Sequence, residues 1–337
     1  MNYRKKSRLP ASEYIQGIIQ GDRVMLSKAI TVVESSLLED NRLAEEILDG
    51  ILPYSGKSLR VGITGVPGVG KSTFIESFGK YITLLNKKLA VLTIDPSSQR
   101  SKGSILGDKT RMIELATDPL AYIRPSASGS ALGGVANKTR ESILLCEAAG
   151  FDVVFVETVG VGQSETAVYG MVDFFLLLML AGAGDELQGI KKGIMEMADA
   201  IAITKADRDN VHAAQRARLE YQNALHLFPA SATGWYPKVL TCSAMEKKGI
   251  KAIWETIEKH HQLMWQKGYF DKKRTEQHID WMHETIKDTL ERRFYQDEQI
   301  KSRINEVEQQ VADKKMPAIK AARMLLEVYE QGEVQNP

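Results

Sequence analysis

Hydrophobic residues change their spacing along the chain, and these changes divide it into three regions. Between about residues 11 and 52 they recur every three or four positions, as at Leu26, Ile30 and Val33, which predicts short amphipathic helices. From about residue 58 to residue 265, short apolar runs alternate with helical stretches, and after Gly268 only the helical spacing remains. The apolar runs predict strands at 60–64, 90–95, 153–157, Phe174–Leu180, Ala200–Thr204 and 239–242.

Most of these predicted strands are apolar along their whole length, as strands covered by helices on both faces should be. Their alternation with helices predicts an α/β fold with a doubly wound, mostly parallel sheet. We expect an N-terminal helical extension at 1–54, an α/β domain at 55–266 and a helical region at 267–337. The last region carries three apolar stripes, too few for a large core of its own, so we expect it to pack on the α/β domain or on a second subunit.

The composition excludes several classes of protein. The 337 residues are 26% charged and 43% hydrophobic, with a formal net charge of +1, which is ordinary for a globular protein and unlike a disordered chain. The near-neutral charge disfavours a nucleic-acid-binding protein with a strong basic field. Two cysteines cannot form a disulfide-rich secreted scaffold, and the longest apolar run, at 174–181, is too short to span a membrane. With no secretory signal, the chain is expected to be cytoplasmic.

The first predicted strand runs into a glycine-rich stretch that fits the phosphate-binding pattern G-x-x-x-x-G-K-[ST]. The match is specific because a buried strand precedes it and a helical stretch follows it. Glycines let backbone N–H groups approach phosphate oxygens, and the start of the following helix adds partial positive charge. Lys71 should reach the β- and γ-phosphates, and Ser72 should hold Mg²⁺. We expect the nucleotide to bind at Gly65, Val66, Pro67, Gly68, Val69, Gly70, Lys71, Ser72 and Thr73.

Two other predicted strands end in an acid, Glu157 and Asp95. Because the carboxyl ends of parallel strands share one edge of the sheet, both carboxylates are expected beside the phosphate-binding loop. With Asp108 and Ser72 they form the predicted Mg²⁺ site. Each acid also has an alternative role that is only structural. Glu157 could be a solvated residue at a strand end, Asp95 could start a turn, and Asp108 could cap a helix.

This arrangement predicts hydrolysis of the γ-phosphate by a water molecule held near Mg²⁺. Lys71 and the metal would stabilise the charge of the transition state, and Glu157 would coordinate the metal through water or order the attacking water. Gly160 follows the strand of Glu157, and its small size would let its backbone N–H meet the γ-phosphate. Lys71, Glu157 and Gly160 are therefore the predicted catalytic residues.

The end of a further strand indicates which base is bound. Thr204, Lys205 and Asp207 match the guanine-reading pattern N-K-x-D, except that Thr replaces Asn. An Asp carboxylate in this position accepts two hydrogen bonds from N–H groups of guanine. Adenine cannot supply that pair of donors, so it would leave a buried charge unpaired.

A second fragment of a base pocket follows the next predicted strand. Ser243, Ala244 and Met245 are similar to an S-A-x loop that contacts the guanine oxygen through backbone N–H groups. The two fragments stand at the ends of consecutive strands, as a shared pocket requires. We therefore predict that the chain binds guanine rather than adenine nucleotides.

Together these motifs resemble those of the MeaB/ArgK family of GTPases. The strings that carry the resemblance are G-V-P-G-V-G-K-S-T at 65–73, D-P-S-S at 95–98, E-T-V-G-V-G-Q-S-E at 157–165 and T-K-A-D at 204–207. The resemblance covers nearly the whole chain and implies a P-loop NTPase fold that binds GTP, GDP and Mg²⁺. It implies a GTP-hydrolysing chaperone of an adenosylcobalamin-dependent acyl-CoA mutase, chiefly methylmalonyl-CoA mutase, that gates cofactor loading and protects the enzyme.

The resemblance also implies how the chain meets its partners. The stretch at 182–193 matches a mobile switch loop through which the family communicates with its mutase, and its candidate residues are Asp185, Gln188, Lys191 and Lys192. For the lysines, a solvated helix face is the alternative. The family is typically homodimeric through its C-terminal helices, in agreement with the apolar stripes near the end of this chain.

Two other functions stand as alternatives. A metal-insertion GTPase would carry a cluster of Cys or His residues, but Cys146 and Cys242 are far apart in the sequence, and the adjacent His260 and His261 point in different directions on a helix. An older family name suggests a kinase or ATPase of a basic amino-acid transport system. Such a kinase would need a phosphate acceptor and a base to position it, and the sequence indicates neither.

Overall fold

The computed structural model describes residues 8–35, 37–94, 112–125, 132–158, 164–182, 192–228 and 231–335. The chain divides into two compact units, Met1–Gln277 and His278–Pro337, and each unit is described by itself. The three-part division of the chain at residues 54 and 266 remains a prediction.

The seven described strands of the first unit form one parallel sheet in the order β3-β2-β4-β1-β5-β6-β7. Strand β1 lies between β4 and β5, and β2, β4 and β6 are buried along their whole length. The predicted α/β fold with a doubly wound parallel sheet is therefore confirmed. The strands are β1 (Leu59–Gly65), β2 (Leu89–Ile94), β3 (Ala121–Pro125), β4 (Val153–Thr158), β5 (Phe174–Leu180), β6 (Ala200–Thr204) and β7 (Lys238–Thr241).

Six of these strands lie within one residue of the predicted bounds, whereas β3 has no predicted counterpart. Strand β3 is at the edge of the sheet and pairs only with β2. Its five residues include Arg124 and Pro125, which interrupt the apolar run by which the other strands are identified. A proline is tolerated there because an edge strand needs hydrogen bonds on one side only.

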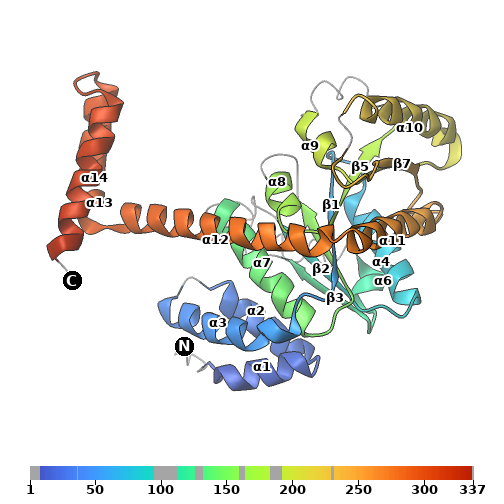
Figure 1. Ribbon diagram of the computed structural model, residues 1–337, viewed down its shortest axis with the longest axis horizontal. Helices are drawn as coiled ribbons and strands as arrows, with labels where there is room; N and C mark the ends of the chain where they lie inside the picture. Colours follow the sequence, from blue (N-terminus) through green and yellow to red (C-terminus); the bar gives the residue numbers. More distant parts are fainter. Residues whose placement is uncertain are drawn as a thin grey trace. The chain divides into compact units, whose positions relative to one another are not determined.

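Helices cover both faces of the sheet, with α4, α6 and α11 on one side and α7 and α8 on the other (Figure 1). The N-terminal helices α1, α2 and α3 pack on one another and on α7. Their apolar stripes are buried at Ile18, Leu26 and Ile47, as their helical spacing requires. The helices of this unit are α1 (Ala11–Ile19), α2 (Arg23–Val33), α3 (Leu38–Ile51), α4 (Lys71–Leu84), α6 (Ile113–Ala116), α7 (Leu132–Ala148), α8 (Ser164–Tyr169), α9 (Lys192–Met197), α10 (Val211–Leu225) and α11 (Ile250–Gln266).

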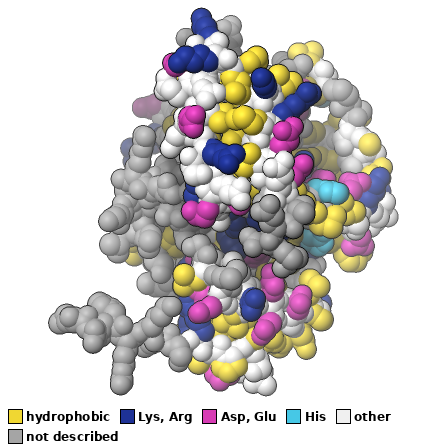
Figure 2. Space-filling model, turned by 90° about the vertical axis from the view of Figure 1, so that its left-hand side faces the viewer, with side chains coloured by type: hydrophobic (Ala, Val, Ile, Leu, Met, Phe, Trp, Pro, Cys, Tyr) yellow, Lys and Arg dark blue, Asp and Glu magenta, His cyan; other side chains and the backbone are white. Residues whose placement is uncertain are grey.

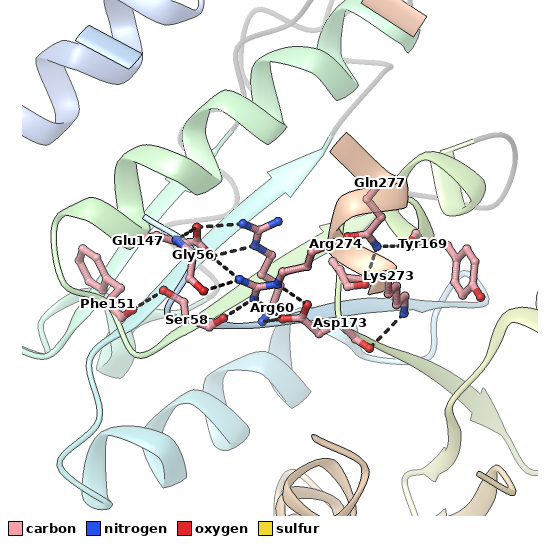
Figure 3. A network of polar contacts seen from close by, with 11 residues as sticks. Gly56, Ser58, Arg60, Glu147, Phe151, Tyr169, Asp173, Lys273, Arg274 and Gln277 are labelled. Atoms are coloured by element: carbon pink, nitrogen blue, oxygen red, sulfur yellow. Dashed lines mark hydrogen bonds and ion pairs between the residues drawn. The ribbon is translucent and has the colours of Figure 1, made fainter. Parts of the chain in front are cut away.

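Four buried charged side chains form two ion pairs at the amino-terminal edge of the sheet (Figure 3). Arg60, near the start of β1, donates two hydrogen bonds of 2.8 Å to the carboxylate of Glu147 on α7. Arg274 donates two, of 2.8 and 2.7 Å, to the carboxylate of Asp173, which directly precedes β5. Such two-point contacts suit the planar guanidinium group and are stronger than single hydrogen bonds.

Arg274 lies on α12 (Tyr269–Gln296) and also donates to the backbone carbonyls of Gly56 and Ser58, each at 2.6 Å. Burial raises the pKa of the Asp173 carboxyl, but the hydrogen bonds and the charge of Arg274 outweigh burial and hold this pKa below its usual range. Both partners therefore stay charged. The network joins the starts of β1 and β5 to the first turns of α12, in an interior where a single unpaired charge would be strongly unfavourable.

The second unit has a small core of its own. Helices α13 (Glu298–Ala312) and α14 (Ala318–Gln335) pack together on it. Asp297 caps the start of α13, where its side chain accepts hydrogen bonds from two backbone N–H groups of the first turn. The buried members of this core are Ile300, Val307, Ala321 and Leu325.

An apolar stripe on α12 is left about half exposed. Its members follow one another at intervals of three or four residues, so they lie on one side of the helix. They are Ile279, Met282, Ile286 and Leu290. A stripe of this length on a helix surface is a feature of helices that associate with another helix.

Two observations concern the helices and the surface of the described residues. No helix in the described part of the chain is both long and apolar enough to cross a membrane. Acidic and basic side chains are interspersed on the face shown in Figure 2, which accords with the formal net charge of +1.

Replacing Arg274 by methionine should lower the free energy of unfolding of the first unit by about 3 kcal/mol, because the buried Asp173 carboxylate would lose its partner. Urea denaturation measures the change. Lys272→Met is the matched control, since Lys272 is exposed and its Nζ lies 3.9 Å from Glu276 on the surface. Such a pair contributes less than about 1 kcal/mol. Equal stabilities of the two variants would contradict the role assigned to the network.

Stability should also depend on pH through His260, on α11. The imidazole is buried against the rings of Phe174 and Trp235, and its Nε2 lies 3.5 Å from Asp199 Oδ1. Burial lowers the pKa of His260, and the nearby Asp199 carboxylate only partly opposes this.

Because the folded state holds His260 neutral, its stabilising contribution is complete above about pH 6.5. It is lost as the pH falls, since the unfolded chain takes up the proton first. The urea midpoint should therefore decrease between pH 7.5 and 5.5, and this decrease should be smaller in His260→Gln. The exposed His226 provides the control, and His226→Gln should keep the full decrease. A decrease of the same size in both variants would argue against this assignment.

Candidate functional site

The phosphate-binding loop connects the end of β1 to the start of α4. Gly68 and Gly70 have φ values of 76° and 88°, in the left-handed region that glycine adopts without strain. Gly65 is needed for another reason: a Cβ there would lie 2.5 Å from the carbonyl oxygen of Leu178 on the neighbouring β5. These glycines allow the loop to turn tightly above the two central strands.

Lys71 begins α4, and its Nζ donates a hydrogen bond of 2.9 Å to the carbonyl of Gly65. Burial lowers the pKa of the Lys71 ammonium, while the nearby carboxylates of Glu157 and Glu165 act in the opposite direction. Glu157 is buried on β4, level with Ile63 of β1. The structure thus brings Lys71 and Glu157 to the same edge of the sheet, with Ser72 in the first turn of α4.

Glu165 is a residue of this site that sequence reasoning did not single out. It lies in the first turn of α8, its exposed fraction is 0%, and its charge acts on Lys71. The signal in the sequence was its position at the end of the string E-T-V-G-V-G-Q-S-E, which also contains Glu157 and Gly160. A buried acid beside the lysine favours the charged form of that lysine.

Six predicted site residues lie outside the described parts of the chain: Asp95, Asp108, Gly160, Asp185, Gln188 and Lys191. Lys192 is the first residue of α9. Among the described residues, no group of three or more His, Cys, Asp or Glu side chains is placed to hold a metal. The Mg²⁺ ligands and the switch residues therefore remain predictions.

The two cysteines are free and buried. Burial raises the pKa of both the Cys146 and the Cys242 thiol. Reactive and metal-binding cysteines need a thiolate in a partly exposed, electropositive environment, and neither thiol has one.

Thr204 and Lys205 connect the end of β6 to the phosphate-binding loop. The Thr204 hydroxyl donates to the carbonyl of Val69 at 2.8 Å. Lys205 has a φ of 53°, and its Nζ donates to the carbonyl of Gly68 at 2.8 Å. The segment that is predicted to read the base is thus fixed to the segment that is predicted to hold the phosphates.

Asp207 is held from the neighbouring loop, because Ser243 Oγ donates to its carboxylate. Ser243 is fixed in turn by two backbone hydrogen bonds with Lys248, of 3.0 and 3.1 Å. The backbone N–H of Ala206 also donates to the carbonyl of Cys242. The two predicted fragments of the base pocket are therefore side by side.

A cavity of about 510 Å³ lies between these segments, a volume typical of small-molecule sites. The predicted residues Val69, Gly70, Thr204 and Asp207 line it, and a larger set contributes as well. That set consists of Thr73, Phe74, Lys205, Arg208, Ala244, Met245 and Glu246. Phe74, Arg208 and Glu246 were not predicted, although each directly follows a predicted motif.

The chain is similar to known proteins along most of its length. A family model described as "Methylmalonyl Co-A mutase-associated GTPase MeaB" matches residues 26–299. The chain belongs to this family. It is also 48% identical to GTPase ArgK of Escherichia coli over 279 residues, which cover 83% of this chain and 84% of that protein.

Two further comparisons span more of the chain. It is 45% identical over 323 residues to the mitochondrial methylmalonic aciduria type A homolog of Mus musculus, covering 93% of this chain and 78% of that protein. A crystal structure of a LAO/AO transport system kinase has a TM-score of 0.76 and 37% identity, with 98% of this chain and all of that chain covered. This likeness supports the P-loop fold described above.

Membership of the MeaB family confirms the predicted resemblance. The chain is a GTPase, and its ligand is a guanine nucleotide. The arrangement of the site suits that ligand, because the glycine loop and Lys71 can receive phosphates while the Asp207 carboxylate can accept hydrogen bonds from the base.

Asp207→Asn should change the preferred nucleotide from GTP to xanthosine triphosphate. Xanthine carries a carbonyl in place of the guanine amino group, and an Asn amide can donate to it. Affinity for GTP should fall by roughly 10- to 100-fold, the loss expected for a hydrogen bond to a charged group. Competition binding measures both ligands. Asp209→Asn, at an exposed carboxylate two residues away, is the control and should keep the preference for GTP. An unchanged preference in Asp207→Asn would show that Asp207 does not read the base.

Proposed function

We propose that this GTPase is a chaperone of an adenosylcobalamin-dependent acyl-CoA mutase, with methylmalonyl-CoA mutase as the preferred client. One observation carries the proposal: the match of residues 26–299 to a family described as methylmalonyl-CoA mutase-associated. The 45% identity to the methylmalonic aciduria type A homolog of Mus musculus supports it. In this proposal GTP binding and hydrolysis gate cofactor loading and protect the mutase, and the chain works in the cytoplasm.

The proposed hydrolysis uses the residues at the carboxyl edge of the sheet. Lys71 would hold the β- and γ-phosphates and stabilise charge as the γ-phosphate leaves. Mg²⁺, when bound, would neutralise phosphate charge, and Ser72, Asp95, Asp108 and Glu157 are its proposed ligands. Ser72 directly follows Lys71 on α4, and Glu157 lies on β4.

The residues after Glu157 suggest slow hydrolysis by the chain alone. Small GTPases place a water-orienting Gln directly after the glycine that meets the γ-phosphate. Here Val161 follows Gly160, and Gln163 comes two positions later. A valine side chain cannot polarise water, so a partner would have to order the site or supply charge.

The partner would be sensed through the loop that holds Asp185, Gln188, Lys191 and Lys192. Charge pairs in such a loop can differ between the GTP and GDP states. We also propose that the chain forms a homodimer through its C-terminal helices. The half-exposed stripe on α12 supports this, because a second helix would bury it.

A kinase of a basic amino-acid transport system is a second candidate, supported by the likeness to the LAO/AO transport system kinase. The two functions differ in where the γ-phosphate goes. Incubation with γ-labelled GTP should release the label as inorganic phosphate only. Label on protein or on lysine, arginine or ornithine would favour the kinase.

GTP hydrolysis should accelerate when methylmalonyl-CoA mutase is added, by roughly ten-fold or more if the partner completes the site. Phosphate release is measured with the chain alone, with the mutase, and with an acyl-CoA enzyme that does not use cobalamin as the control. Lys71→Ala should abolish the activity in all three, which shows that the signal comes from this site. Equal and fast rates of GTP hydrolysis with and without mutase would contradict the proposed coupling.

The physical association is tested separately. Immobilised mutase should retain the chain to different extents with GTP, with GDP and without nucleotide, since the switch loop is expected to differ between these states. Retention that is independent of nucleotide would contradict gating, and no retention would contradict the choice of client.

A further inference from the structure

Thr204 occupies the position where the guanine-reading pattern has asparagine, and the structure shows what its hydroxyl does. The residue ends β6, only 3% of it is exposed, and it lines the cavity next to the phosphate-binding loop. Its hydroxyl points to two backbone carbonyls, Val69 O at 2.8 Å and Met179 O at 3.3 Å. A hydroxyl has one proton, so a proton given to either carbonyl is not available to a ligand.

Guanine presents two different edges to a protein. The N1–H and amino groups are donors, and Asp207 can accept from them. O6 and N7 are acceptors, so each needs a donor from the chain. Reading both acceptors would require two separate donors in the wall of the cavity.

Donors for O6 are present in the loop after β7. The N–H of Ser243 is bonded to Lys248, and the N–H of Glu246 is bonded to Ser243 Oγ. The backbone N–H groups between them, those of Ala244 and Met245, make no hydrogen bond within the described chain, and both residues line the cavity. They are free to donate to O6.

The side-chain donors at the first two positions of the base-reading segment are both used within the protein. Thr204 gives its proton to the protein, and the ammonium of Lys205 is held on the carbonyl of Gly68. An asparagine amide has two protons and could serve the loop and the base together. A threonine hydroxyl can donate its one proton to only one of them, and here it donates to the carbonyl of Val69 in the phosphate-binding loop.

We infer that this GTPase recognises guanine through N1, the amino group and O6 but does not read N7, and that Thr204 is a positioning residue that fixes the base-reading segment to the phosphate-binding loop. The inference rests on guanine-nucleotide binding by this family and is independent of the identity of the mutase. Nucleotides that lack the acceptor at position 7 should therefore bind as well as GTP.

Competition binding of 7-deaza-GTP, in which N7 is replaced by C–H, tests the inference on the chain alone. Its affinity should equal that of GTP within about two-fold, whereas loss of a hydrogen bond to N7 would weaken binding on the order of ten-fold. Inosine triphosphate lacks the amino group and should bind at least roughly ten-fold more weakly. A ten-fold deficit of 7-deaza-GTP would overturn the inference, and so would equal binding of all three nucleotides, since the base would then not be read.

Variants of Thr204 separate positioning from reading. Thr204→Val removes the hydroxyl and keeps the shape, so GTP and 7-deaza-GTP should both weaken by the same factor, roughly five-fold for one hydrogen bond. Thr204→Ser keeps a proton and should restore both. Thr241→Val, at the end of the neighbouring β7 and outside the cavity lining, should change neither. If Thr204→Val weakened GTP and left 7-deaza-GTP unchanged, Thr204 would be reading N7 and the inference would fail.

Discussion

The parallel direction of the strands is the constraint on which the site depends. Gly65, Glu157, Thr204 and Ser243 stand at or just beyond the ends of four strands, and they are separated by up to nearly two hundred positions in the sequence. They meet because parallel strands finish at the same edge of a sheet, where ligands of such folds bind. Hydrogen bonds between the loops then set the finer geometry. The tie from Thr204 to the phosphate-binding loop is the clearest example.

The opposite edge of the sheet holds charges that take no part in the chemistry. Arg60 and Arg274 are each matched with a buried carboxylate there, and Arg274 also reaches two backbone carbonyls. Desolvation offsets much of the attraction within such a network, so the loss of one partner costs more stability than the intact pair contributes. The network attaches the start of α12 to the amino-terminal edge of the sheet. The candidate nucleotide site lies at the carboxyl edge, so the two tasks fall on opposite edges of the sheet.

Much of the fold could be predicted because the interior strands are continuous apolar runs, as Phe174–Leu180 illustrates. Strand β3 could not, since an edge strand may hold Arg124 and Pro125 without loss of pairing. The phosphate-binding loop was recognisable because its chemistry needs fixed residues at fixed intervals. The contact of Thr204 with Val69 was not, because the two residues are 135 positions apart and either could be hydrogen-bonded elsewhere. Glu165 escaped notice for the same reason: only the folded chain brings its carboxylate near Lys71.

The burial of both thiols has a practical consequence. Alkylating reagents and oxidants attack the thiolate, and the raised pKa values of Cys146 and Cys242 keep that form scarce at neutral pH. A cysteine introduced at an exposed position would thus be far more reactive than either natural one. Fluorescent or spin labels could therefore be attached to a single introduced surface cysteine without first replacing Cys146 and Cys242.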